Sequence, residues 1–369
     1  MDTTTTTTLS FPAESSRPLA TIVKVKRLLP IANADRILLA EVKGWRCVVK
    51  REEFQEGDLA IYISIDSIVD GSDPTFAFLN GKTRIKTVKL RGVVSQGLLG
   101  PIDWLTSRGV DGTNLTEGDD VTTLLGVTKY VPKEEVDQYQ YYPAVNGRCL
   151  KPFPEFVPKT HESRLQDDGL CLDSIKGREI VITRKEDGCS CSFIWNNGDF
   201  FICGRRFIWE APDACNSHYF QIQDAFDVEN KMKSLGRNIA LQGEIVGGKI
   251  NSNRLKLKER DFRVFNVYDI NNQSYLGWKD VLEICEHLGM YSVAVVYQGP
   301  ADDLELSTDA FLELASKQTY AKGELAEGIV VKTDDRCDDN GDGDDHHYHH
   351  RRVSFKVISN EYLLKHERD

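Results

Sequence analysis

The chain has 369 residues, of which 40% are hydrophobic and 28% are charged, and its formal net charge at pH 7 is −11. This length accommodates two domains with separate cores, and no run approaching 18 apolar residues predicts a membrane-spanning helix. Nine cysteines without metal-site spacing favour reduced thiols, as in a protein of the cytoplasm or the nucleus.

The negative charge is concentrated in one segment. Residues 334–345 contain seven aspartates and one arginine, a balance of −6, which is more than half of the net charge. A phosphate-binding site needs positive charge only locally. The acidic composition therefore does not exclude a nucleic acid as a partner.

The first 17 residues, which include six consecutive threonines, lack the basic and apolar blocks of a secretory signal and predict a disordered tail. Short strand-like segments follow, separated by turn formers and without a long helix between them. This spacing predicts a small antiparallel barrel. The expected strands are 19–25, 36–42, 45–49 and 59–64.

A basic stretch, Arg84–Leu99, continues this half of the chain. Its first eight residues interleave four cations with apolar residues, from Arg84 to Arg91. The stretch is interpreted either as a phosphate-binding face or as an edge strand protected by its charge. Residues 111–152 are rich in turn formers and are interpreted as barrel closure and a linker, with a domain boundary near residue 150.

The segment 183–188, Thr-Arg-Lys-Glu-Asp-Gly, lies between the β-branched run 179–182 and the strand-like run 189–195. A lysine in this position, with a carboxylate two residues later, is typical of a nucleophilic amine. Because only about one lysine in a thousand is neutral near pH 7.5, nearby cations are expected to depress the pKa of Lys185. Gly188 is expected to let the backbone pass close to a nucleotide. Taken alone, Lys-x-Asp-Gly also occurs in solvated hairpin turns.

Further segments follow in order. Helices are predicted over 224–235, 278–289 and 308–317, as scaffold. Glu244 precedes two glycines. A carboxylate in this position can contact a ribose hydroxyl or a metal-bound water, or it can be only an acidic residue near a turn. Glu327 and Lys332 are five residues apart and face opposite sides of an ideal strand, so a shared site requires a twist or bulge. The segments are 242–248, 262–270, 327–332 and 353–358.

Together with 183–188, these segments resemble the ordered motifs of the covalent nucleotidyltransferases, which include polynucleotide ligases and capping enzymes. In this superfamily, DNA ligases and capping enzymes carry an OB domain after the last motif, whereas here residues 30–35 and the strand after them resemble an OB barrel that precedes the motifs. The chain therefore resembles the fifth class of RNA ligases. The resemblance implies an α+β fold, with an OB-type β-barrel over 18–150 and an ATP-grasp-like nucleotidyltransferase domain of antiparallel sheets flanked by helices over 151–369. The latter carries an acidic, His-rich insert at 334–350.

The resemblance also implies the chemistry. Lys185 attacks the α-phosphate of ATP to form a lysyl-AMP, AMP passes to an RNA 5′-phosphate, and an RNA 3′-hydroxyl displaces it. Residues implied in catalysis are Lys185, Lys332 and Lys356. The same three lysines and Arg164, Arg205, Glu244 and Tyr268 are implied in binding the nucleotide, with Tyr268 stacking on adenine and Phe265 as its competitor. Asp187, Glu244 and Glu327 are implied to orient a hydrated Mg²⁺ or Mn²⁺.

The sequence departs from this family pattern at two positions. Arg206 stands where the family usually has asparagine, and Ser354 stands where many RNA ligases have a further lysine. Phosphate binding is therefore expected to rest on Lys332, Lys356 and Arg164, or on Arg351 and Arg352.

The implied partner is RNA with 5′-phosphate and 3′-hydroxyl ends, in a nicked duplex. The protein is expected to act as a monomer and not to associate with a membrane. Two alternatives stay open. The first is a DNA-sealing or GTP-dependent capping-type enzyme, and the second is a non-catalytic RNA-binding protein built on the OB fold.

Overall fold

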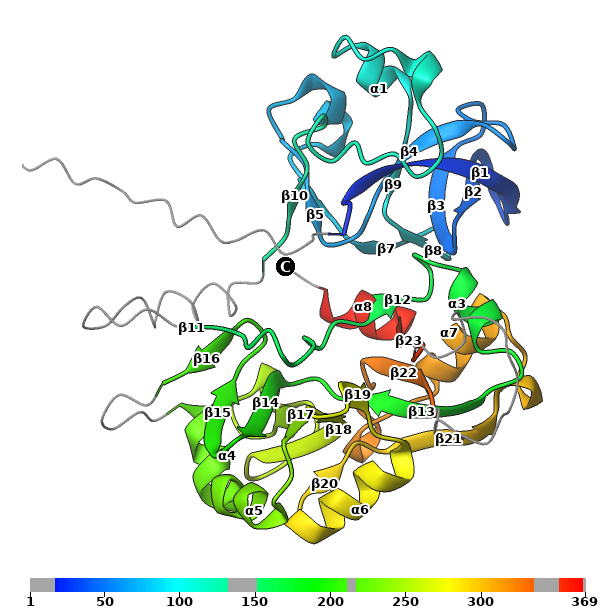
Figure 1. The fold of residues 1–369 in the computed structure, drawn as a ribbon. Coiled ribbons are helices and arrows are strands. Elements are labelled where there is room, and N and C mark those ends of the chain that lie inside the picture. Colours follow the sequence, from blue (N-terminus) through cyan, green and yellow to red (C-terminus); the bar gives the residue numbers. More distant parts are fainter. Residues whose placement is uncertain (1–16, 132–150, 211–216, 335–351, 368–369) are drawn as a thin grey trace, which may run out of the picture. The chain divides into compact units, whose positions relative to one another are not determined.

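The computed structural model describes residues 17–131, 151–210, 217–334 and 352–367, which belong to two compact units, Met1–Pro132 and Lys133–Asp369 (Figure 1). The predicted tail, the boundary near residue 150 and the insert at 334–350 lie, apart from Arg17 and Asp334, outside the described residues. The domain limits therefore stay predictions. None of the helices in the described part of the chain has the length and hydropathy needed to cross a lipid bilayer.

Most of the regular elements of the first unit are strands, besides two 3-10 helices, Pro74–Leu79 and Gly112–Asn114. The strands are β1 (Ala20–Ile31), β2 (Ala34–Val42), β3 (Trp45–Lys50), β4 (Leu59–Ile63), β5 (Ser67–Ile68), β6 (Arg84–Ile85), β7 (Thr87–Leu90), β8 (Val93–Gln96), β9 (Leu98–Pro101) and β10 (Thr128–Lys129), and they are accompanied by a short α-helix, α1 (Asp103–Thr106). The main sheet has the order β3-β2-β1-β4-β9. β1 pairs with β4 through its first half and with β2 through its second half, so the sheet coils around β1. This is the arrangement expected of a small barrel.

Part of the basic stretch of this unit forms a separate ribbon. β7 and β8 pair only with each other, and Lys89, Leu90 and Arg91 at their turn are exposed. Arg84 lies over the ring of Tyr130, 3.6 Å from its centroid. Only residues 87–96 form this ribbon, since Arg84 and Ile85 belong to β6 and Leu98 and Leu99 begin β9, an edge strand of the main sheet. The pairing is compatible with the edge-strand interpretation, and the phosphate-binding role stays a prediction.

The second unit contains two sheets, the larger of which has eight strands. Its strands are β11 (Lys151–Pro152), β14 (Cys189–Asn196), β15 (Asp199–Cys203), β16 (Phe207–Trp209), β17 (Ile239–Val246), β18 (Asp261–Asp269), β19 (Ser274–Tyr275) and β20 (Tyr291–Ser292), and its helices are α4 (His218–Phe226), α5 (Val228–Leu235) and α6 (Trp278–Leu288). The three helices contact one face through β17, β14 and β18 (Figure 1). Their apolar side chains form the largest core with that face.

The second sheet has the strand order β12-β23-β22-β13-β21. Its strands are β12 (Ser163–Arg164), β13 (Glu179–Lys185), β21 (Val295–Pro300), β22 (Gly328–Thr333) and β23 (Ser354–Ile358), and the nearby helices are α3 (Leu170–Ser174), α7 (Thr308–Ser316) and α8 (Asn360–His366). Alternate residues of β13, β22 and β23 pack with α3 and α7 in one core. The intervening residues, among them Lys185, Lys332 and Lys356, therefore share the opposite face.

The predicted helices are present with adjusted limits. Those predicted over 278–289 and 308–317 correspond to α6 and α7. The helix predicted over 224–235 is instead two helices, because Asp227 adopts a left-handed conformation with φ 50° between α4 and α5. A left-handed residue ends the hydrogen-bond ladder of α4.

A partly buried histidine at the start of α4 predicts a pH-dependent stability. Burial, and secondarily Arg260, lowers the pKa of His218 from 6.5 to about 4. In the unfolded chain His218 is protonated as the pH falls below about 6.5, whereas in the folded chain it stays neutral down to about pH 4. The free energy of unfolding therefore decreases as the pH falls through this window. In urea unfolding, wild type should lose about 2 kcal/mol from this group between pH 7 and pH 5, and His218→Gln should not. His287→Gln, at an exposed histidine, is the control and should retain the wild-type dependence. An unchanged pH dependence in His218→Gln would contradict this assignment.

Candidate active site

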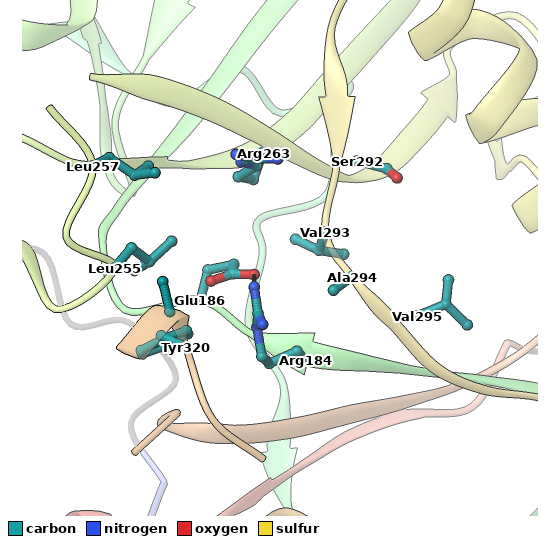
Figure 2. Close-up of a pocket in the computed structure, with 11 residues that line it drawn as sticks. Arg184, Glu186, Leu255, Leu257, Arg263, Ser292, Val293, Ala294, Val295 and Tyr320 are labelled. Carbon is teal, nitrogen blue, oxygen red and sulfur yellow. Dashed lines mark hydrogen bonds and ion pairs between the residues drawn. The ribbon is translucent and has the colours of Figure 1, made fainter. Parts of the chain in front are cut away.

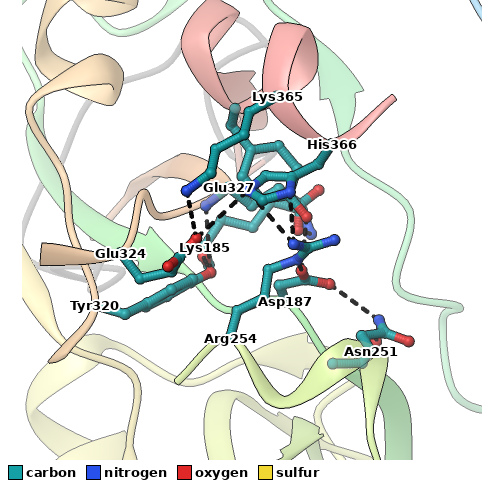
Figure 3. Close-up of polar contacts among 11 residues, drawn as sticks. Lys185, Asp187, Asn251, Arg254, Tyr320, Glu324, Glu327, Lys365 and His366 are labelled. Carbon is teal, nitrogen blue, oxygen red and sulfur yellow. Dashed lines mark hydrogen bonds and ion pairs between the residues drawn. The ribbon is translucent and has the colours of Figure 1, made fainter. Parts of the chain in front are cut away.

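The predicted nucleophile, Lys185, is the last residue of β13, and its amine is in contact with a carboxylate. Its Nζ lies 2.6 Å from Oε2 of Glu327, and the two side chains are 24% and 20% exposed (Figure 3). Burial lowers the pKa of Lys185, but the charges of Glu327, Glu244 and Asp187 outweigh it and hold the pKa above its ordinary value. Carboxylates therefore dominate the field of the protein's own charges at the amine, and the expected lowering of this pKa by nearby cations stays a prediction.

A special backbone conformation brings Glu327 to the amine. β22 begins at Gly328, which pairs with Lys185 and has φ 154°. A Cβ at Gly328 would lie 2.1 Å from the carbonyl oxygen of Val357, so this position requires glycine. Glu327 therefore lies outside the strand. The rule that residues five apart face opposite sides of an ideal strand does not apply to Glu327 and Lys332.

Glu244 lies on β17, directly across from Ser190 of β14. A Cβ at Gly188 would approach the carbonyl oxygen of Ile245 to 2.2 Å and Cγ of Glu244 to 2.8 Å. Gly188 thus permits the nucleophile loop to lie against β17, whereas the sequence predicted close approach to a nucleotide. Burial, with a further contribution from the negative charges of Glu327 and Asp187, raises the pKa of Glu244 to about 8.

Asp187 is held by donors from two distant segments. It accepts hydrogen bonds from Asn251 at 3.0 Å and from the hydroxyl of Tyr362 on α8 at 2.6 Å, and it forms an ion pair with Arg254 (Figure 3). Arg254 also contacts Nδ1 of His366 at 2.6 Å. The loop after β17 and the helix α8 therefore meet at this carboxylate.

Lys356 and Arg164 supply positive charge beside the nucleophile. They are paired residues of β23 and β12, and the backbone N–H of Leu165 donates to the carbonyl of Lys356 at 3.0 Å. Burial, followed by the charges of Arg164 and Lys185, lowers the pKa of Lys356 to about 7. Arg205, exposed on the loop after β15, also repels this amine and contacts His161 at 3.3 Å. These predicted phosphate contacts lie around the cluster of Lys185.

Lys332, in contrast, belongs to a second polar cluster. Its amine is buried and donates to the carbonyl of Phe265 at 2.7 Å and to the side chain of Asn266 at 3.0 Å. Arg352 donates to the same Asn266 oxygen at 2.7 Å. Burial, and then the charge of Arg352, lowers the pKa of Lys332 to about 7. Lys332 pairs with Val181, which lies four residues before Lys185 on β13. Four residues of a strand span roughly 13 Å. The prediction that Lys332 contacts the α-phosphate beside Lys185 is therefore not supported.

Tyr268, the predicted adenine-stacking residue, is a core residue in this structure. It is 8% exposed, packs in a cluster with Phe153 and Ile194, and meets Tyr275 edge-on. A register shift between β17 and β18 leaves Phe265 without a partner residue, and its ring lies 5.5 Å from the amine of Lys332. The prediction for Tyr268 is corrected: the bulge offers Phe265, its competitor, as the available aromatic ring.

The predicted metal ligands Asp187, Glu244 and Glu327 surround the amine from three segments of the chain. Within the described residues, no group of three or more acidic, histidine or cysteine side chains is arranged to hold a metal ion directly. The donor set is nonetheless all oxygen, which suits a hard divalent cation, and it concentrates negative charge. The chemistry of these residues suits a hydrated divalent cation, and metal binding by them stays a prediction.

Sequence reasoning missed the residues that position this cluster. Besides Asn251, Arg254, Tyr362 and His366, they include Tyr320, whose hydroxyl donates to the carbonyl of Lys185 at 2.7 Å. These residues lie in irregular loops or on α8, a helix that was not predicted from the sequence. A tyrosine shortly before a Lys-Gly turn, seven residues from Glu327, was the only available signal.

Comparisons with known proteins agree with this arrangement. The family described as RNA ligase matches residues 178–358, and an OB-fold domain matches residues 19–102. A search of curated protein sequences finds no match. Solved structures of an RNA ligase from Naegleria gruberi are similar over both units. A point mutant of that enzyme with AMP and Mn has a TM-score of 0.79 at 30% identity, covering 95% of this chain and 99% of that one. The same enzyme with PPi has a TM-score of 0.78 at 31% identity, with 95% and 99% covered.

The fold and the site therefore define a covalent nucleotidyltransferase with an amino-terminal OB-fold domain, as the sequence predicted. Within that class, the chain belongs to the RNA ligase family. The expected α+β architecture, a barrel followed by antiparallel sheets flanked by helices, is confirmed.

Proposed function

We propose that this RNA ligase uses ATP and a divalent cation, Mg²⁺ or Mn²⁺, and that Lys185 carries AMP during the reaction. The observation that supports the assignment most directly is the contact of 2.6 Å between the amine of Lys185 and Glu327, within a cluster that contains Glu244, Asp187 and Lys356. Among the similar Naegleria structures, one mutant holds AMP and Mn and another holds ATP and Mn.

Lys185 must lose a proton before it can attack. The attack forms a bond from Nζ to the α-phosphorus of ATP and breaks the bond to the bridging oxygen, and pyrophosphate leaves with that electron pair. Glu327, whose Oε2 touches the amine, is the group in contact that can accept the proton. A divalent cation held by Asp187, Glu244 and Glu327 supplies positive charge that offsets the phosphate oxygens and the carboxylates.

Lys356, Arg164 and Arg205 bind the phosphate oxygens in this proposal. Lys356 lies within electrostatic reach of both arginines, whose charges add to the effect of burial in lowering its pKa. An anion placed among them offsets the effect of the arginine charges, and the charge developing in the transition state strengthens the attraction. Lys332, with Asn266 and Phe265, is assigned to the nucleoside end, since it lies farther along the sheet.

The RNA substrate has a 5′-phosphate and a 3′-hydroxyl, presented at a nick in a duplex and bound by a monomer. AMP passes from Lys185 to the 5′-phosphate, and the 3′-hydroxyl then displaces it. Free thiols at the described cysteines, Cys47, Cys171, Cys189, Cys191, Cys203 and Cys285, favour a reducing compartment, the cytoplasm or the nucleus.

The proposal is tested by intact-mass measurement after incubation with ATP or GTP and Mg²⁺ or Mn²⁺. We expect a mass increase equal to AMP with ATP only. The adenylylated protein is then given nicked duplexes that differ only in the sugar of the 3′-hydroxyl nucleotide, and sealing of the ribonucleotide nick is expected to be faster. A GMP adduct would favour a capping-type enzyme, equal sealing of a deoxyribonucleotide nick would favour a DNA-sealing enzyme, and no adduct would favour a non-catalytic RNA-binding protein.

A further inference from the structure

The pairing of β13 with β22 ends at the nucleophile. The last pair is Lys185 with Gly328, and the conformation of Gly328 directs Glu327 away from the strand. The carbonyl of Glu327 accepts from the backbone of Ser359 at 2.9 Å. Its N–H and the carbonyl of Lys185 are thus left at the end of the ladder, where the two chains separate.

A single side-chain oxygen joins these two backbone groups. The hydroxyl of Tyr320 donates to the carbonyl of Lys185 at 2.7 Å and accepts from the N–H of Glu327 at 3.2 Å. Tyr320 is 4% exposed. One hydroxyl therefore fixes the spacing between the backbone of the amine donor and the backbone of the carboxylate that contacts it.

Tyr320 is itself anchored in a tight loop. Its N–H donates to the carbonyl of Glu324 at 2.7 Å, and the N–H of Ala326 donates to the carbonyl of Gln318 at 3.1 Å. Its ring packs with Val246 and Leu255 and lies beneath the guanidinium of Arg184. The loop thus carries the hydroxyl to the end of the ladder in a fixed position.

The ring also borders a cavity behind the nucleophile loop. This cavity, of about 380 Å³, is lined by Tyr320, Arg184, Glu186 and residues of the neighbouring strands (Figure 2). Packing is therefore incomplete on that side of the ring, and the two hydrogen bonds of the hydroxyl define its position.

We propose that Tyr320 is a positioning residue for adenylylation, which holds the backbones of Lys185 and Glu327 at the separation that brings amine and carboxylate into contact. The inference rests on the proposed function of the same site. Displacement of reacting groups by about 1 Å can reduce a rate about 100-fold, so the loss of this bridge acts on the chemical step. Tyr320 contacts neither the nucleotide phosphates nor the RNA in this account.

The test compares Tyr320→Phe with Tyr297→Phe. Tyr297 is a matched control because its hydroxyl also donates to a backbone carbonyl at 2.7 Å, that of Pro300, away from Lys185. Single-turnover formation of the lysyl-AMP should be about 10- to 100-fold slower in Tyr320→Phe at saturating ATP, with KM for ATP nearly unchanged. Tyr297→Phe should match wild type. Equal rates in the two variants would overturn the proposal.

Two further measurements separate positioning from general stability. In a double-mutant cycle, Tyr320→Phe should cause little additional loss in a Glu327→Gln background, because both changes disturb one contact. Multiplicative losses would contradict the proposal. Genetically encoded p-aminophenylalanine at 320, which retains a donor, should restore most of the rate, whereas a packing role would be served equally by phenylalanine. Wild-type protein that forms no adduct would overturn the proposed function itself, and with it this inference.

Discussion

Lys185→Ala is expected to abolish transfer of AMP to the protein, with at least about a 1,000-fold loss in single-turnover rate. The substitution removes the atom that forms the bond to phosphorus, and no other group in the described cluster is an amine in contact with Glu327. Intact-mass measurement after incubation with ATP and Mn²⁺ reads the result directly. The variant should fold, because the side chain is partly exposed at a strand end.

Lys176→Ala is the control for this change. Lys176 is exposed and forms its ion pair with Asp173, three residues away. It should accept AMP at the wild-type rate. A Lys185→Ala protein that still gained the mass of AMP would show that the nucleophile is another residue.

Lys356→Ala is expected to slow adenylylation by about 100- to 1,000-fold at saturating ATP, the magnitude typical of removing one group that stabilises a developing oxyanion. Its amine makes no hydrogen bond or ion pair with another described residue and lies near Arg164 and Lys185. A positive charge that is already in place beside the phosphate stabilises the transition state most, because the phosphate becomes more negative there. The loss should therefore appear in the rate constant more than in KM.

Lys317→Ala provides the matched control, since Lys317 is exposed and paired with Glu313 of α7. Lys356→Arg should retain part of the activity because it keeps the charge but not the geometry of the amine. If Lys356→Ala formed the lysyl-AMP as fast as Lys317→Ala, the assignment of this residue to the phosphate would be wrong.

Much of the fold could be predicted from the sequence because strands and helices carry local signals. The strands expected at 36–42 and 45–49 correspond to β2 and β3, and the amphipathic stretch 278–289 is α6. The order of the motifs also identified Lys185, Glu244 and Glu327, whose mutual coupling the structure now shows. Periodicity and collinear motifs are properties of short segments, so a single sequence contains them.

The remainder depended on distant contacts and on backbone detail. The family resemblance placed Lys332 beside Lys185, but its distance along the strand and its hydrogen bond to Phe265 separate it from the nucleophile. Tyr268 was preferred over Phe265 because of its place in the family motif, and the register shift at Phe265 has no sequence signature that could have corrected this. The order of the motifs also placed Asp187, Glu244 and Glu327 near Lys185, but it does not contain the balance between burial and charge that sets the pKa of this amine.

The pairing of β12 with β23 has a consequence for how the enzyme reaches its active form. Arg164 and Lys356 become neighbours only when the beginning and the end of the second unit meet. Contacts between residues so far apart in sequence form slowly, because a long loop must close first. During refolding, helix and sheet content is therefore expected to recover before the capacity to become adenylylated, which requires that the two ends of the second unit have paired.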